Sequence, residues 1–153
     1  MAIYLVQHGI SVSKEIDPDP GLSEEGRNNV QRIAEVAKSY QIRPAQIKHS
    51  GKKRARETAE IFKRTLNVKK NLTRIKGIKP LDDVIHFAQS LDGNNSLMIV
   101  SHLPFLERLT AYLTTGNPNV TVFKFQNSGI VCLDQLPIPY GWVIKWAFMP
   151  NIT

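Results

Sequence analysis

The chain has 153 residues, of which 42% are hydrophobic, and a formal net charge of +7 at pH 7. This length and apolar content allow one domain with one core, so residues 1–153 are expected to form a single domain. No apolar run approaches the ~20 residues of a membrane-spanning helix, and the N-terminus lacks the layout of a signal peptide. A lone cysteine, Cys132, excludes an internal disulfide. These features predict a cytoplasmic protein without a membrane partner.

The positive charge is concentrated between Lys48 and Lys79. This basic segment holds twelve of the twenty lysines and arginines, against two acidic residues, Glu57 and Glu60. Such a field favours anionic partners, which include nucleic acid, phosphorylated protein and small phosphate compounds. Nucleic acid is the less favoured of these, because Phe62, the aromatic residue of the segment, is expected to be buried by its own helix.

Strands alternate with helices along most of the chain. The expected elements are a strand at 3–7, a polar loop at 10–21, a helix capped by Ser23 that ends before Pro44, a weak strand at 47–50, a helix at about 52–66, an irregular or weakly extended stretch at 67–79, a short helix at about 82–91, a strand at 97–100, a helix opened by Pro104 and stopped at Gly116, and strands at 120–125, 130–133 and 142–148. This order predicts an α/β fold, a three-layer α/β/α sandwich around a mixed, mostly parallel sheet.

Two histidines lie where apolar strands end, His8 after the first strand and His102 after the strand at 97–100. In open α/β sheets, ligands bind in the crevice beyond the carboxyl ends of the strands, so we expect both histidines to face one pocket. The helix at 52–66 begins with several cations, Arg54 among them. Cations are mildly unfavourable at a helix N-terminus, and an anion bound there would explain them.

His8, Arg54 and His102 together suit phosphoryl transfer. That reaction needs an in-line nucleophile, and neutral histidine can serve. It also needs positive groups around the phosphoryl oxygens, for which the guanidinium fork is well shaped. Each residue alone is also common as a structural residue. A metal site is disfavoured because no third ligand accompanies the two histidines, while His49 and His86 look like ordinary loop and surface-helix residues.

Four segments in this order resemble motifs of the histidine phosphatase superfamily. They are Leu5–Ser11, Gly21–Gly26, Ser50–Ala59 and Met98–Leu106, and the last is closest to the SixA-like phosphohistidine phosphatases. The resemblance implies a phosphoglycerate mutase-like fold and a phosphatase that requires neither a metal nor another cofactor. It also implies that His8 becomes phosphorylated, that Arg54 and His102 hold the phosphoryl oxygens, and that the substrate is phosphohistidine in a protein or a small phosphate compound. Gln7, Gly9 and Ser128 are the further phosphate-binding residues expected from it.

Two positions depart from the family pattern. Gln7 stands where the family has arginine, and neutral donors form hydrogen bonds about half as strong as charged ones. The usual glutamate acid is also missing; Asp83 is the candidate acid, although Asp82 and Asp83 also suit a helix start. Phosphohistidine tolerates this absence, because its imidazole leaves readily once protonated. The alternative function is a catalytically weakened phosphate-binding or regulatory member of the fold.

Overall fold

The structure is a computed structural model that describes residues 2–92, 95–137 and 141–152. Its elements are β1 (Ala2–Gln7), α1 (Glu24–Ser39), β2 (Gln46–His49), α2 (Lys53–Leu66), β3 (Thr73–Arg74), α3 (Val84–Ala88), β4 (Leu97–Ser101), α4 (Phe105–Thr115), β5 (Ile130–Leu136) and β6 (Gly141–Phe148). The strands form one sheet in the order β3-β2-β4-β1-β5-β6. β3, β2, β4 and β1 run parallel, and β5 and β6 are antiparallel to their neighbours. The predicted mixed, mostly parallel sheet is confirmed.

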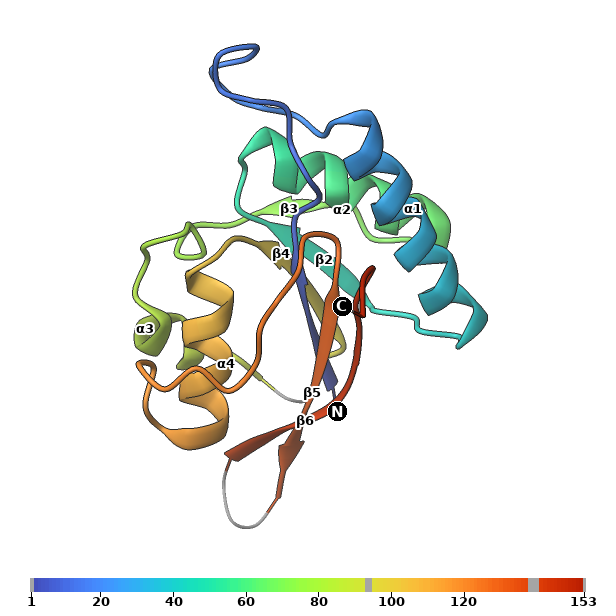
Figure 1. Cartoon of the computed structure of the whole chain (residues 1–153). Coiled ribbons are helices and arrows are strands. Elements are labelled where there is room, and N and C mark those ends of the chain that lie inside the picture. Colours follow the sequence, from blue (N-terminus) through green and yellow to red (C-terminus); the bar gives the residue numbers. More distant parts are fainter. Residues whose placement is uncertain (1, 93–94, 138–140, 153) are drawn as a thin grey trace.

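Helices cover both faces of the sheet (Figure 1). α1 and α2 lie on one face, and α3 and α4 lie on the other. Side chains alternate along β1 accordingly: Val6 packs into the core beneath α1 and α2, whereas Ile3 and Leu5 pack into the core beneath α3 and α4. Two buried cores on one sheet are what the predicted α/β/α sandwich requires.

Local sequence accounts for the start of α1. The Ser23 side chain accepts a hydrogen bond from the backbone N–H of Gly26, and Glu24 and Glu25 occupy the first turn. Both features stabilise a helix N-terminus, by capping and by complementing its dipole. The buried residues recur at helical spacing, at Val30, Ile33, Ala34 and Ala37.

The strand expected at 120–125 is wrong. That segment is irregular and pairs with neither sheet edge. Phe123 and Phe125 contact each other edge-on, with ring centroids 5.7 Å apart, and pack into the core beneath α3 and α4. Val120 and Val122 are exposed. An extended segment lying on a core shows the same alternation of apolar burial as a strand, without the hydrogen-bonded ladder.

The remaining differences concern element boundaries. The short helix expected at 82–91 is the single turn and a half of α3, and Pro104 is the N-cap of α4 rather than its first helical residue. The two last strands form the expected hairpin, with β5 longer than predicted. Part of the turn predicted between them, at 138–140, lies outside the described residues.

Candidate active site

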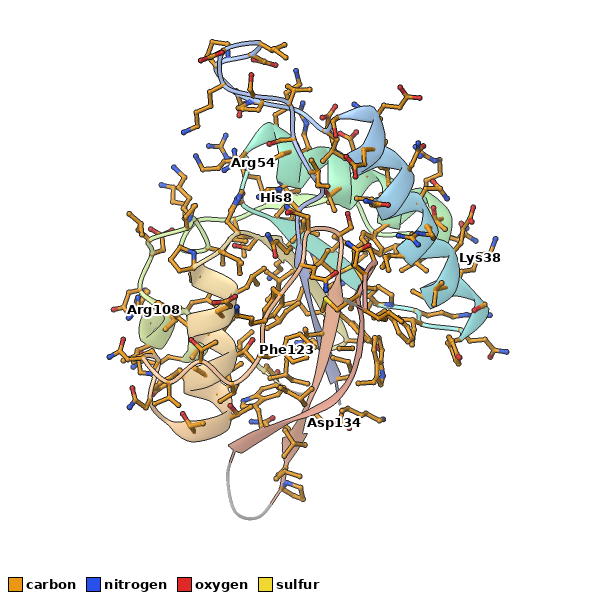
Figure 2. All side chains as sticks on the ribbon, in the orientation of Figure 1. His8, Lys38, Arg54, Arg108, Phe123 and Asp134 are labelled. Atoms are coloured by element: carbon orange, nitrogen blue, oxygen red, sulfur yellow. The ribbon has the colours of Figure 1, made fainter. Side chains whose placement is uncertain are left out.

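The carboxyl ends of β1, β2 and β4 meet at one edge of the sheet. His8, Ser50 and His102 each directly follow one of these three parallel strands. The rings of His8 and His102 lie with their centroids 5.0 Å apart. Figure 2 shows His8 at this edge, next to Arg54 at the start of α2. The predicted convergence of the two histidines and Arg54 is therefore present.

The hydrogen bonds of His8 define which ring nitrogen carries the proton. Arg54 Nε donates to Nε2 of His8 at 3.3 Å, and because a guanidinium only donates, Nε2 must be the acceptor. Nδ1 then carries the hydrogen and donates to the Gly9 carbonyl at 2.7 Å. The lone pair on Nε2 thus lies beside the guanidinium of Arg54, as a nucleophile next to a cation.

Burial keeps both histidines neutral. Desolvation, assisted by the nearby charge of Arg54, lowers the pKa of His8 to about 4. Desolvation followed by the influence of His8, Arg54 and Lys52 lowers the pKa of His102 to about 3. At neutral pH the two rings therefore bring hydrogen-bonding capacity and a nucleophile to the site, while Arg54 brings positive charge.

His102 is oriented by Ser50. Nε2 of His102 lies 2.6 Å from Ser50 Oγ, which in turn accepts the backbone N–H of Lys52 at 3.4 Å. The other ring nitrogen, Nδ1, is buried and has no partner. Ser50 belongs to the family-like segment, but the sequence reasoning assigned it no role, and a serine between a strand and a basic helix was the signal available.

Among the described residues, buried side-chain nitrogen and oxygen atoms without a hydrogen-bond partner are confined to this region. They are Gln7 Oε1, His102 Nδ1 and Ser128 Oγ. Leaving such an atom unpaired costs about 1–3 kcal/mol, and buried polar groups are ordinarily paired. A ligand with both donors and acceptors, such as a protonated phosphoryl group with its oxygens, would satisfy them.

The turn before β5 supports His8 from the other side. The backbone N–H of Ser128 donates to the Gln7 carbonyl at 2.9 Å, and the Asn127 side chain donates to the His8 carbonyl at 2.9 Å. Ser128 has a φ of 74°, in the left-handed region, so the turn is sharp. The sequence reasoning named Ser128 in this turn but gave the Asn127 side chain no role.

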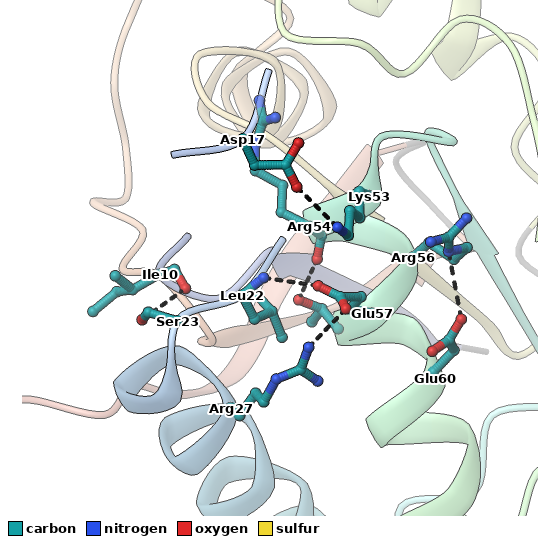
Figure 3. A network of polar contacts seen from close by, with 11 residues as sticks. Ile10, Asp17, Leu22, Ser23, Arg27, Lys53, Arg54, Arg56, Glu57 and Glu60 are labelled. Atoms are coloured by element: carbon teal, nitrogen blue, oxygen red, sulfur yellow. Dashed lines mark hydrogen bonds and ion pairs between the residues drawn. The ribbon is translucent and has the colours of Figure 1, made fainter. Parts of the chain in front are cut away.

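The loop at 10–21 is tied to α2 by charged contacts (Figure 3). Lys53 Nζ forms an ion pair with Asp17 at 2.9 Å. Glu57 accepts the backbone N–H of Leu22 at 2.8 Å and pairs with Arg27 at 2.7 Å. These contacts hold the chain that follows His8 against the helix that carries Arg54.

The other candidate residues have structural environments. The exposed Asp83 side chain caps α3, where it accepts the backbone N–H groups of Ile85 and His86, so it occupies the helix-start role noted as its alternative. His49 is not a loop residue as expected: it ends β2, is buried, and accepts the backbone N–H of Gly51. His86 is exposed on α3 as expected. Within the described ranges no group of three acidic, cysteine or histidine side chains could hold a metal ion.

A family model supports the resemblance found from the motifs. Residues 3–77, which include His8 and Arg54, match the model described as histidine phosphatase superfamily (branch 1). Over residues 3–77 the chain is similar to the histidine phosphatase superfamily. His102 lies beyond the matched segment, and it is the fold that brings it against His8. The comparison with curated proteins found no match.

Solved structures of several phosphatases share the fold. The protein histidine phosphatase SixA, complexed with tungstate, superposes with a TM-score of 0.84 at 22% identity, over 98% of this chain and 97% of that chain. A candidate phosphohistidine phosphatase SixA from Agrobacterium tumefaciens gives a TM-score of 0.77 at 24% identity, over 97% of each chain. The alpha-ribazole phosphatase from Shigella flexneri gives 0.79 at 14% identity, over 100% of this chain and 98% of that chain.

Helix length and hydropathy bear on membrane insertion. In the part of the chain that the structure describes, no helix is both long enough and apolar enough to cross a bilayer.

Proposed function

We propose that this protein is a phosphatase that works through a phosphohistidine intermediate on His8, and that its substrate is phosphohistidine in a protein. The observation that carries the proposal is the neutral His8 ring, whose Nε2 lone pair lies 3.3 Å from the guanidinium of Arg54. A nucleophile held beside a fixed cation is the arrangement that phosphoryl transfer requires.

The reaction has two steps on this site. In the first, Nε2 of His8 attacks phosphorus, an N–P bond forms, and the bond to the leaving atom breaks with its electron pair remaining on that atom. In the second, water attacks the phosphorus of phosphohistidine, which releases inorganic phosphate and restores neutral His8. Arg54 compensates the charge on the phosphoryl oxygens in both steps.

The hydrogen bond between His8 Nδ1 and the Gly9 carbonyl assists the first step. As Nε2 forms its bond to phosphorus, the ring becomes positively charged, and a carbonyl acceptor 2.7 Å from Nδ1 stabilises that charge. The same contact limits rotation of the ring, so Nε2 stays beside Arg54, and the hydrogen bond from Arg54 must give way when Nε2 bonds to phosphorus.

The substrate assignment rests on the leaving group. Asp83 is engaged as a helix cap, and a phosphate ester needs an acid to protonate its alkoxide. The imidazole of a protonated phosphohistidine leaves as a neutral group, so this substrate needs no such acid. Both SixA structures carry names that refer to histidine phosphatases, which favours the same substrate, whereas the alpha-ribazole phosphatase is named for a small ester.

A second function, phosphate binding without turnover, is favoured by Gln7. Its side chain is 8% exposed and uncharged where the family pattern has arginine. Losing one preorganised donor at such a site costs about 10²–10³ in rate.

Transfer of labelled phosphate from a phosphohistidine protein, without added metal, separates the two functions. Wild type is compared with His8→Asn, Gln7→Arg and the exposed-histidine control His86→Asn. Turnover and an acid-labile phosphoenzyme in wild type and His86→Asn, both lost in His8→Asn, are expected. No turnover in wild type, together with turnover in Gln7→Arg, would instead identify a protein that binds phosphate without hydrolysing the substrate. Turnover that survives in His8→Asn would refute the phosphohistidine mechanism.

A further inference from the structure

The loop at 10–21 brings a carboxylate to the start of α2. Asp19 Oδ1 accepts the backbone N–H of Lys53, the residue before Arg54, at 3.4 Å. The Asp19 backbone N–H donates to Asp17 Oδ1 at 3.0 Å, and Asp17 itself pairs with the Lys53 side chain. In Figure 1 this loop extends past the N-terminal end of α2. Hydrogen bonds of both its carboxylate and its backbone N–H therefore hold Asp19 at the rim of the site.

The charge of Asp19 reaches Arg54. Burial lowers the pKa of Arg54, and Asp19 acts in the opposite direction, as a negative charge near a guanidinium must. Elsewhere in the site, His8 and His102 are neutral, Gln7 stands in place of an arginine, and the charge of Lys52 helps to lower the pKa of His102. The site thus combines the positive charges of Arg54 and Lys52 with a negative group at its rim, and it lacks the second arginine of the family pattern.

This combination disfavours a phosphate dianion. A carboxylate close to the phosphate-binding guanidinium repels the second negative charge of an ordinary phosphate ester or of inorganic phosphate. The same carboxylate attracts a positively charged leaving group. A phosphoryl group on a protonated imidazole has both a smaller negative charge and a positive neighbour.

We propose that Asp19 is a specificity-determining residue that favours phosphoryl groups on protonated nitrogen, such as phosphohistidine, over O-phosphate esters. The inference rests on the proposed function and supplies a reason for the missing acid. When His8 Nε2 bonds to phosphorus and the P–N bond breaks, its electron pair returns to the imidazole nitrogen. The other imidazole nitrogen already holds the proton that Asp19 favours, so the leaving group departs neutral.

Asp19→Asn tests this with little structural change, because asparagine keeps an oxygen to accept the Lys53 N–H and removes only the charge. Asp17→Asn is the matched control, since it alters the same loop and breaks the ion pair with Lys53. The kcat/KM for a phosphohistidine peptide and for p-nitrophenyl phosphate is measured for each variant, together with the binding of inorganic phosphate by calorimetry.

For Asp19→Asn, the kcat/KM for the phosphohistidine peptide divided by that for p-nitrophenyl phosphate is expected to fall on the order of fivefold. This is the effect of one unit charge near a protein surface. It should also tighten phosphate binding by a similar factor, whereas Asp17→Asn changes both substrates in parallel. A parallel change in Asp19→Asn, an equal shift of the ratio in Asp17→Asn, or unchanged phosphate binding would each overturn the inference. If the wild type transfers no phosphate at all, the proposed function fails and the leaving-group role fails with it. His8-dependent turnover with an unchanged ratio refutes the Asp19 role alone.

Discussion

The hydroxyl of Thr58 accepts the backbone N–H of Gly9 at 3.0 Å. The same hydroxyl donates to the carbonyl of Arg54, one turn earlier in α2, at 2.8 Å. Thr58 is fully buried, so this is a solvent-shielded link between Gly9, the residue after His8, and the helix that holds Arg54. Because the Gly9 carbonyl also receives the His8 Nδ1 hydrogen, Thr58 helps to determine the orientation of the His8 ring.

Thr58→Val should therefore affect stability and activity together. Valine retains the shape but leaves the Gly9 N–H unpaired, which is expected to cost about 1–3 kcal/mol in the free energy of unfolding. Urea unfolding measures the first effect, and kcat for phosphoryl transfer measures the second. Thr58→Ser keeps the hydroxyl and should recover most of the activity; equal kcat values for wild type and Thr58→Val would contradict the orienting role.

Ser50→Ala should lower kcat while leaving the fold intact. The substitution removes the oxygen 2.6 Å from His102 Nε2, so the ring is no longer held with Nδ1 directed as it is now. We expect a loss of about 10–100-fold, similar to other losses of an orienting hydrogen bond. Ser39→Ala, at the exposed end of α1, is the matched control. In a double-mutant cycle with His102→Asn the two losses should not add, since both act through one ring; full additivity would show that Ser50 acts elsewhere.

Gln7 offers a test of whether an unpaired buried atom is retained for ligand binding. Gln7→Met has a similar shape and removes the unpartnered Oε1, so it should raise the free energy of unfolding by about 1 kcal/mol. The same change should weaken vanadate binding, while Gln7→Arg should strengthen it by adding a charged donor. Calorimetry and thermal unfolding check both. If Gln7→Met binds vanadate as well as wild type does, the side chain does not contact the phosphoryl group.

The histidines predict a pH dependence with a definite sign. Their pKa values in the folded protein, about 4 for His8 and about 3 for His102, lie below the ordinary 6.5. Below pH 6.5 the unfolded chain therefore binds more protons than the folded protein. The contribution of His8 and His102 to the free energy of unfolding should be complete above pH 6.5 and should decrease as the pH falls below it. The slope reaches about 1.4 kcal/mol per pH unit for each histidine.

Urea unfolding at pH 7.5 and pH 5 measures this effect, and the difference between wild type and His8→Asn isolates the share of His8. His86→Asn, at an exposed position on α3, is the control variant. The acid limb of kcat/KM should likewise lie well below pH 6.5, because that limb reports groups of the free enzyme. An acid limb at pH 6.5 would show that His8 is solvated rather than desolvated.

Much of the fold follows from local sequence. Ser23 and Gly26 define the start of α1, and the spacing of Val30, Ile33 and Ala37 defines its buried face. The apolar run of β1 and the position of His8 just beyond it are equally local. Local patterns failed at 120–125, where Phe125 is buried and Phe123 partly buried against a core, and the segment pairs with no strand. Whether an alternating segment joins a sheet depends on a free strand edge, which is a property of the assembled fold.

The candidate site divides in the same way. His8, Arg54 and His102 could be selected from the sequence because each lies next to a strand end or a helix start, and parallel strands end at a common edge. The neutral charge state of the histidines, the unpartnered atoms of Gln7 and Ser128, and the position of Asp19 beside Lys53 depend on burial and on contacts between distant segments. The sequence thus determined which groups are available, and tertiary packing decided their protonation and their partners, because desolvation and hydrogen-bond geometry exist only once the segments are brought together.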